Sequence, residues 1–395
     1  MVETVHAWAK ELKGLHERMA HRFVRAEPRR RVLAYLKGLA GTSDRKNSWQ
    51  LAEAGGELTP DGMQRLLNQA HWEADLVRDD LREYVLEHFG DPEAVLVIDE
   101  TGFLKKGDKS VGVQRQYTGT AGKRENCQIG VFLCYASKKR GAAFLDRALY
   151  LPKSWAGNAQ RREEAGVPKE VAFATKPELA KAMLERALEA GVPAAWVTGD
   201  AVYGGNRRLR MFLEGRGQSF VLAVKRDEPL WALELERGPG QVAADRLAEE
   251  AVAPEDWTWL SAGDGSKGPR LYEWALVPLF RLQLTEEERY WGHWLLLRRS
   301  PEEPEELAYY VVFAPKETTT LEEVVRVAGT RWTIESCFES AKGEFGLDEY
   351  EVRKWEAWHR HVTLSLLAHA FVGVVRSREA QKGARLGALM EICCP

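Results

Sequence analysis

The spacing of hydrophobic residues changes near residue 90, from a helical pattern to a strand-like one. Before that point, residues 48–56 predict a short helix that ends in glycines. Residues 59–67 predict a second helix, with Thr59 as its capping residue and Pro60 at its first position. Two short helices joined by a glycine-containing turn indicate a helix-turn-helix. Any small helical bundle can show this pattern, so a DNA-binding pair and a structural bundle are both compatible with it.

After residue 90, apolar runs that end in a carboxylate indicate buried strands. Residues 95–99 are almost continuously apolar, as in a strand covered on both faces, and residues 194–200 repeat the pattern. Further strands are expected at 111–117, 127–136, 143–151 and 220–224, and helices at 177–190 and about 206–213. Strands that alternate with helices predict an α/β core.

Residues 225–318 interrupt this alternation. They hold 11 basic and 19 acidic residues, many turn residues and short aromatic runs, which predicts a β-rich insertion. Helical spacing returns at 318–328 and 330–345. The last apolar stretch, 362–375, has 14 residues, fewer than the roughly 20 needed to cross a bilayer, and predicts a buried helix.

Composition adds the setting in which the chain works. The 395 residues carry a formal charge of −3, and the N-terminus has no apolar signal-peptide core. Five cysteines show neither metal-ligand spacing nor the density of a disulfide scaffold, which favours a reducing cytoplasm. We therefore expect a cytoplasmic protein with no membrane partner.

The near-neutral total hides two basic segments. Residues 1–50 hold 11 basic against 5 acidic residues, and residues 104–140 hold 9 against 2. We expect DNA contacts from both segments, at Arg29, Arg30, Arg31, Lys105, Lys106, Arg115, Lys123 and Arg124. A solvated charged surface is the alternative for each of them.

Two aspartates follow the buried strands directly. Asp99 and Asp200 would lie at the C-terminal edge of their strands, where open α/β sheets place ligand sites. If the two strands are adjacent, both carboxylates face one cleft. Each aspartate could instead cap a turn, because Asp is common after strands.

A third carboxylate lies on the helix expected at 330–345. At about 100° per residue, Arg331, Glu335 and Lys342 fall within a sector of roughly 60°. The adjoining sector is apolar and consists of Ile334, Phe338, Ala341 and Phe345. The charges therefore follow the buried edge of the helix, although an ordinary ion pair at a core margin remains open.

Two aspartates and a glutamate suit hard divalent cations, which prefer oxygen ligands. Two such ions would activate an attacking oxygen and stabilise a leaving oxygen in phosphoryl transfer. Arg331 and Lys342 would then hold phosphates beside them.

These residues resemble the DDE transposases of bacterial insertion sequences. The resemblance lies in Val97-Ile-Asp99-Glu-Thr, Gly199-Asp200-Ala-Val-Tyr203-Gly204 and Arg331-x3-Glu335-x6-Lys342. The last spacing is that of the insertion-sequence-4-like group. The stretches 149–155, 173–180 and 346–353 are similar to the insertion-sequence-701 family.

The resemblance implies an α/β fold with a ribonuclease-H-like, retroviral-integrase-type core. It implies Asp99, Asp200 and Glu335 as catalytic ligands of two Mg²⁺ or Mn²⁺ ions. The wider group often has a tyrosine three residues before the arginine, where this chain has Ala328. Tyr203 is a candidate to supply the missing phosphate contact.

The resemblance also implies the partners. It implies double-stranded DNA, as the terminal inverted repeats of an element and as target, a homodimer in the DNA complex, and association with the nucleoid. A domesticated DNA-binding derivative and an endonuclease that cuts without joining are the alternatives. We expect a helical DNA-binding domain at 1–90, a first part of the core at 91–224, the insertion at 225–318 and the remainder of the core at 319–395.

Overall fold

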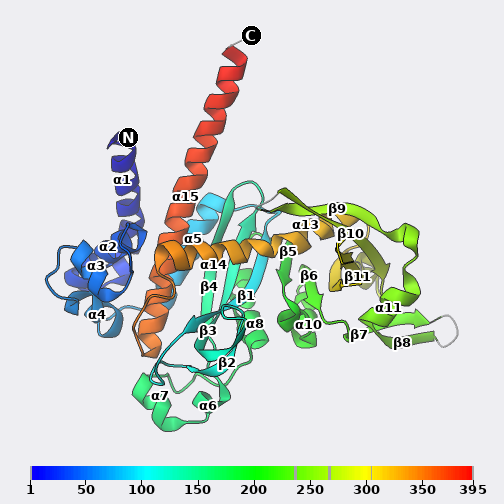
Figure 1. Cartoon of the computed structure of the whole chain (residues 1–395), viewed down its shortest axis with the longest axis horizontal. Coiled ribbons are helices and arrows are strands. Elements are labelled where there is room, and N and C mark those ends of the chain that lie inside the picture. The colour runs from blue at the N-terminus through cyan, green and yellow to red at the C-terminus, as the bar shows by residue number, and fades with distance from the viewer. Residues whose placement is uncertain (1, 235–237, 266–267, 304, 394–395) are drawn as a thin grey trace. The chain divides into compact units, whose positions relative to one another are not determined.

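The computed structural model describes residues 2–234, 238–265, 268–303 and 305–393, and these form a mixed α/β protein (Figure 1). The chain divides into two compact units. The first unit comprises Met1–Asp91, Glu100–Thr175 and Glu335–Pro395, and the second comprises Pro92–Asp99 and Lys176–Ile334. Strand β1 (Val95–Leu104) and helix α14 (Trp332–Phe345) each contribute residues to both units.

The first unit begins with helices. They are α1 (Val2–Met19), a short 3-10 helix (Ala20–Arg22), α2 (Ala26–Ala40), α3 (Ser48–Ala54), α4 (Asp61–Asn68) and α5 (Ala74–Phe89). The side chain of Asn47 accepts hydrogen bonds from the backbone of Trp49 and Gln50, which fixes the start of α3. Helix α4 starts one residue later than expected, because Pro60 is its N-cap and not its first helical residue.

The strands of the first unit are β2 (Gln114–Thr118), β3 (Lys123–Ser137), β4 (Gly141–Leu149) and the end of β1. They have the order β2-β3-β1, and β2 and β4 both pair antiparallel with β3. Short helices α6 (Lys153–Ala156) and α7 (Ala159–Ala165) follow β4. The long helix α15 (Trp355–Cys393) packs against β4, α5 and α2.

Helix α14 has the amphipathic pattern that the sequence predicts. Ile334, Phe338, Ala341 and Phe345 are buried, whereas Glu335 and Lys342 are half-buried. The ring of Phe338 lies 5.2 Å from that of Phe132 in β3, in an edge-to-face arrangement. Within the first unit, the apolar face of α14 therefore packs on the sheet.

The second unit joins parallel strands to an antiparallel set. Its strands are the start of β1, β5 (Trp196–Gly199), β6 (Ser219–Val224), β7 (Pro229–Glu234), β8 (Gly238–Ala243), β9 (Thr258–Gly265), β10 (Gly268–Pro278), β11 (Trp291–Arg299) and β12 (Leu307–Pro315). Its helices are α8 (Lys176–Glu189), α9 (Ala201–Gly204), α10 (Arg207–Gly215), α11 (Ala244–Ala251), α12 (Glu286–Tyr290) and α13 (Leu321–Thr330), with a short 3-10 helix at Pro254–Asp256. The sheet order is β1-β5-β6-β12-β11-β10-β9.

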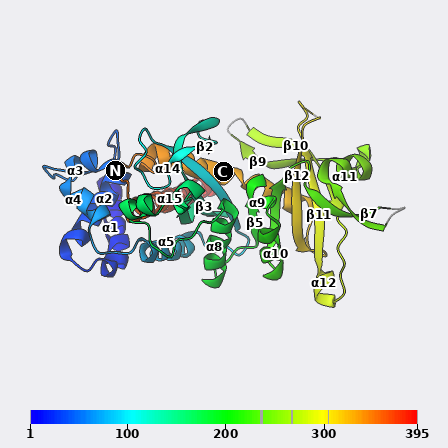
Figure 2. The ribbon, with the colours of Figure 1, turned by 90° about the horizontal axis from the view of Figure 1, so that it is seen from below.

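The strands of residues 225–318 differ from the expected separate subdomain. Strand β12 pairs antiparallel with β6, with Val311 opposite Leu222, and β11 to β9 follow (yellow and green in Figure 2). Of the described strands, only β7 and β8 form a sheet of their own. The segment is rich in strands, and β9 to β12 continue the sheet of the second unit, a pairing that the pattern of one segment does not specify.

The expected division into four domains also differs from the two compact units. Residues 176–224 belong to the same unit as the β-rich segment, and residues 100–175 belong with the N-terminal helices. Helix α15 explains the second grouping, because it packs against both the helices and β4. None of the helices in the described part of the chain is long and apolar enough to span a membrane.

Candidate active site

Asp99 and Asp200 occupy matching positions along neighbouring strands of the second unit. Asp200 directly follows β5, but β1 continues past Asp99 to Leu104, so the expectation that the first strand ends at Asp99 was wrong. Strands β1 and β5 run parallel, with Val97 opposite Thr198 and Ile98 opposite Gly199. The next position along this register places Asp99 beside Asp200. Parallel neighbours lie about 4.8 Å apart, and residues opposite each other project to the same face. The sequence predicted that the two aspartates lie close together only if their strands are adjacent, because a sequence does not show which strands pair.

Asp200 also fulfils its alternative role as a cap. Its Oδ1 accepts a hydrogen bond of 2.9 Å from the backbone N–H of Val202 and caps α9. Its backbone is still extended, with φ −77° and ψ −176°. The cap therefore orients the Asp200 carboxylate at the start of α9.

Asp99 has a cation beside it. Nη1 of Arg331 lies 3.4 Å from Oδ2 of Asp99, and both side chains are largely buried. Arg331 is the C-cap of α13 and has helical backbone angles, and α14 begins at the next residue, Trp332. The sequence pattern had predicted that this helix begins at Thr330. Two residues before Arg331, Gly329 packs so closely on Ala262 that a Cβ would overlap the Ala262 carbonyl. This contact fixes the end of α13 that presents Arg331.

Glu335 lies in the first unit, one turn along α14 and half-buried. Its neighbours Ile334 and Cys337 are buried, and Sγ of Cys337 lies 3.8 Å from Sγ of Cys134 in β3. Within the first unit, these contacts fix the helical rotation that sets the position of Glu335 at the core margin.

Lys342 uses all three of its N–H donors on oxygen atoms of the protein. Its Nζ donates to Thr101 Oγ1 at 2.7 Å, to Gly102 O at 3.2 Å and to Thr120 Oγ1 at 3.2 Å. Burial lowers the pKa of its ammonium group. A phosphate would therefore have to replace one of these partners.

Thr101 and Thr120 are residues that the sequence reasoning missed. The Thr120 hydroxyl donates to Gly102 O and accepts from Gly102 N–H, so it ties the turn after β2 to β1. A Cβ at Gly102 would overlap Thr118 Oγ1, so this close approach requires glycine. Strand alternation provided a signal for Thr101, because it lies two residues after Asp99 in β1 and so shares its face.

The basic segment after β1 divides into packed and exposed cations. Nζ of Lys105 lies 3.6 Å from the centroid of the Tyr350 ring and donates to the Tyr350 carbonyl, and burial lowers its pKa to about 8. Lys106, Arg115 and Arg124 are exposed, and Lys123 forms an exposed ion pair with Glu125 at 3.1 Å. In this structure Lys105 is a packing residue, whereas the side chains of Lys106, Arg115, Lys123 and Arg124 are exposed to solvent.

The three arginines near the N-terminus also differ. Arg31 pairs with Glu57 and Glu27, and Arg29 donates to the Phe23 carbonyl at 2.9 Å. Arg30 is exposed on α2. We expected all three arginines to contact DNA, but in this structure Arg29 and Arg31 already bond to groups of the first unit.

Tyr203 does not fit its expected role in this structure. Its side chain has no exposed surface, because α9 packs on β6 and turns the tyrosine inward. No face of the ring or hydroxyl is accessible to a phosphate. Ala328, three residues before Arg331, is also buried, on α13.

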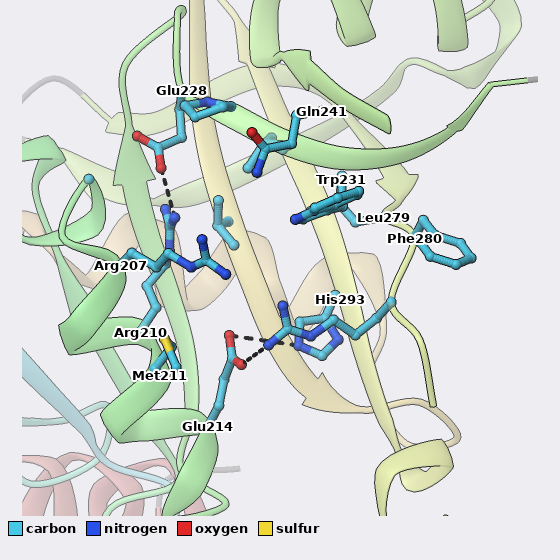
Figure 3. A pocket seen from close by; sticks show the side chains of 15 residues that line it. Arg207, Arg210, Met211, Glu214, Glu228, Trp231, Gln241, Leu279, Phe280 and His293 are labelled. Atoms are coloured by element: carbon cyan, nitrogen blue, oxygen red, sulfur yellow. Dashed lines mark hydrogen bonds and ion pairs between the residues drawn. The ribbon is translucent and has the colours of Figure 1, made fainter. Parts of the chain in front are cut away.

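A cavity of about 300 Å³ opens elsewhere in the second unit (Figure 3). Arg210 pairs with Glu228 at 2.7 Å on one side, and Trp231 lies on another. Glu214 lies 3.8 Å from His293 and pairs with Arg281. The aspartates and Arg331 do not line this cavity. This cavity is therefore separate from Asp99 and Asp200.

The donor groups near the two aspartates decide whether a metal ion could bind. Among the described residues, no group of three or more His, Cys, Asp or Glu side chains lies close enough to hold a metal ion. Asp99 and Asp200 nevertheless have the right chemistry for Mg²⁺ or Mn²⁺, because both are carboxylates at one strand edge. His361 uses both ring nitrogens, on the Tyr35 hydroxyl and the Gly346 carbonyl, and one ring nitrogen of His359 lies 2.9 Å from the Trp355 carbonyl, so both act as packing residues within the first unit.

The fold and the paired aspartates define a mixed α/β protein with an acidic strand edge. Two family models match the chain: one described as a DDE superfamily endonuclease over residues 18–263, and one described as a transposase DDE domain over residues 174–371. The chain belongs to the DDE superfamily of endonucleases and transposases.

A curated relative points in the same direction. The chain is 26% identical over 184 residues to a "Probable transposase for insertion sequence element IS701" from Microchaete diplosiphon. The match covers 46% of this chain and 45% of the relative, so it spans less than half the length of that protein.

Proposed function

We propose that the chain is a DNA transposase that cleaves the terminal inverted repeats of an insertion sequence and joins the ends to target DNA. The observation that carries the proposal is the register of β1 and β5, which sets Asp99 beside Asp200. Family membership supplies the reaction class. The name of the curated relative supports an element similar to IS701.

Asp99, Asp200 and Glu335 act as the catalytic carboxylates of a ribonuclease-H-like core in this proposal. They would hold Mg²⁺ or Mn²⁺, two ions in all. Bound divalent ions supply activation of an attacking oxygen and neutralise the charge that develops on a leaving oxygen. The cap from Val202 holds the Asp200 carboxylate in place before any ligand arrives.

The two cations on and before α14 act on phosphate. Arg331 lies 3.4 Å from Asp99, so its guanidinium is held at the carboxylate where a scissile phosphate would bind. Lys342 is held by two threonine hydroxyls and a carbonyl, all neutral groups. A phosphate oxygen is a stronger partner for an ammonium group than a hydroxyl, which favours an exchange when DNA binds.

DNA is the partner that the reaction class requires. We propose that the N-terminal helices, within residues 1–90, recognise the terminal repeats. We also propose that two copies of the chain act together on paired ends, in the cytoplasm at the nucleoid. The exposed cations Lys106, Arg115, Lys123, Arg124 and Arg30 are the proposed phosphate contacts.

The test is a cleavage and joining assay on duplex DNA that carries the repeat read from the sequence flanking the gene. Asp99→Asn, Asp200→Asn and Glu335→Gln should each abolish cleavage and joining with Mg²⁺ or Mn²⁺, and should leave binding in a gel shift intact. Asp264→Asn, an exposed carboxylate in the same unit as the aspartates, is the matched control.

The outcomes separate the alternatives. Cleaved but unjoined product from the unaltered chain would indicate an endonuclease, and binding without cleavage would indicate a domesticated derivative. Cleavage by Glu335→Gln at the unaltered rate would remove this glutamate from the catalytic set.

A further inference from the structure

Helices α2, α3 and α4 form a three-helix group in the first unit, in which each helix packs against the other two. Leu51 and Ala52 of α3 and Met63, Leu66 and Leu67 of α4 are buried. The turn between α3 and α4 contains Gly56 with φ +74°, a left-handed conformation that favours glycine. Two short packed helices joined by a glycine-containing turn, here residues 55–60, are similar to a helix-turn-helix with a longer turn, in which the second helix presents its outer face.

The C-terminal end of α4 is fixed by side chains from outside the helix. Nη1 of Arg360 in α15 donates to the Leu67 carbonyl at 2.9 Å, and its Nη2 donates to the Trp72 carbonyl at 2.8 Å. Nε1 of Trp72 donates to the Leu66 carbonyl at 2.8 Å. These bonds satisfy carbonyls that a helix end otherwise leaves unpaired.

The N-terminal end of α4 is held as well. Arg31 of α2 donates to Glu57 in the turn at 3.0 Å. A Cβ at Gly62 would overlap the Arg31 guanidinium, so the first turn of α4 lies directly against it. Both ends of α4 are therefore anchored, and its outer face is presented in a fixed orientation.

That outer face consists of polar side chains. Gln64, Arg65 and Asn68 are exposed, one helical turn apart or adjacent around the helix. Nδ2 of Asn68 donates to the Gln64 carbonyl at 2.9 Å, which holds the amide and keeps its oxygen available. Arginine is the side chain that bonds guanine with two hydrogen bonds in the major groove, and Asn and Gln do the same with adenine.

We propose that α4 is the helix that reads the DNA sequence, with Gln64, Arg65 and Asn68 contacting base edges in the major groove. Arg31 and Arg360 are positioning residues that hold the helix. This inference rests on the proposed function for its partner, and it assigns recognition to a single helix face.

The alternative occupant of this face is a protein partner. The composition of the face disfavours a protein partner. The large apolar side chains exposed near the helix pair are Trp49, 52% exposed on α3, and Leu58, fully exposed in the turn. Neither belongs to α4. Protein interfaces place apolar and aromatic residues at their centre, whereas this face offers amides and a guanidinium. Residues 1–50, which include α2, carry six more basic than acidic residues, as suits a phosphate backbone.

The experiment compares two duplexes, one selected by the unaltered full-length chain from a randomised pool and one with the same composition in shuffled order. Arg65→Lys keeps the charge and removes the two-pronged guanidinium. The double variant Gln64→Ala with Asn68→Ala removes the amides. Each should reduce the preference for the selected duplex by about 5- to 100-fold, the range for loss of a bidentate base contact, and leave affinity for the shuffled duplex unchanged.

Arg30→Ala, an exposed cation on α2, is the matched control and should weaken binding to both duplexes equally. Thermal unfolding of each variant checks that the bundle remains folded. An unchanged preference in the folded α4 variants, or an equal loss on both duplexes, would overturn the inference.

The proposed function fails separately from this inference. If the unaltered chain neither prefers any duplex nor cleaves one, the transposase proposal is wrong. If it cleaves the selected duplex and the α4 variants keep their preference, only the assignment to α4 is wrong.

Discussion

Arg147 in β4 provides the sharpest test of how the first unit is held together. Its side chain is almost completely buried and donates to Thr363 Oγ1 in α15 at 2.9 Å and to Asp75 Oδ1 in α5 at 2.8 Å. The Asp146 carboxylate, also buried, lies 3.7 Å from it. One guanidinium therefore connects a strand to two helices.

Replacing Arg147 with Met leaves the buried Asp146 carboxylate without its nearest guanidinium. Removing one partner of a buried ion pair costs about 3–5 kcal/mol. Arg78 still lies 3.8 Å from Asp146, so we expect the lower end of that range, about 3 kcal/mol. For a cooperative unit of this size, that loss corresponds to a decrease in Tm of about 6–12 °C.

The assay is thermal and urea unfolding of Arg147→Met beside Arg246→Met. Arg246 forms an exposed ion pair with Glu250, and its loss should cost less than about 1 kcal/mol. Adding Asp146→Asn to Arg147→Met should recover part of the loss, because it removes a buried charge whose compensation has been reduced. Equal Tm decreases for Arg147→Met and Arg246→Met would refute the reasoning.

Three further predictions follow from buried or exposed groups. Burial lowers the pKa of His359 to about 3, and those of His361 and His369 to about 4. Because the unfolded chain binds protons first, stability should fall as pH drops below about 6.5, by up to about 1.4 kcal/mol per pH unit for each histidine. The contributions of His361 and His369 should level off near pH 4 and that of His359 near pH 3; urea midpoints between pH 8 and 4 test this, and a flat series would contradict it. Thr120→Val should remove one of the three hydrogen-bond partners of Lys342 and lower the local stability by about 1 kcal/mol. The backbone N–H of Gly102 should then exchange roughly fivefold to tenfold faster, whereas the control Thr120→Ser should keep its protection. Neutralising Arg30 alone should flatten the salt dependence of DNA binding by about 0.9 log unit per log unit of salt. The triple variant, which also neutralises Arg29 and Arg31, should show the same change if those two arginines bond only within the protein. A clearly larger change in the triple variant would show that they also contact phosphate.

The sequence predicted the local elements well and their partners poorly. The buried strands that carry Asp99 and precede Asp200 and the buried face of α14 follow from patterns a few residues long, whereas the continuation of β1 to Leu104 does not. The pairing of β12 with β6 does not, because 82 residues, 225–306, lie between the end of β6 and the start of β12, more than any local pattern spans.

The same limit applied to the charged residues. The sequence showed that Arg31 and Lys105 are cations, but their partners Glu57 and Tyr350 come from other segments. A basic run in the sequence therefore combined residues that bind protein groups with residues that face solvent. Only the exposed members remain candidates for contact with DNA.

The division of α4 into a packed face and an outer face has an evolutionary consequence. Gly62, Met63, Leu66 and Leu67 are buried, whereas Gln64, Arg65 and Asn68 are exposed. Substitutions at the exposed positions leave the packing of the bundle intact, so they can accumulate at little cost in stability. A duplicated copy of the gene could then acquire a preference for altered ends, and two related elements in one genome would cease to mobilise each other while their folds stayed the same.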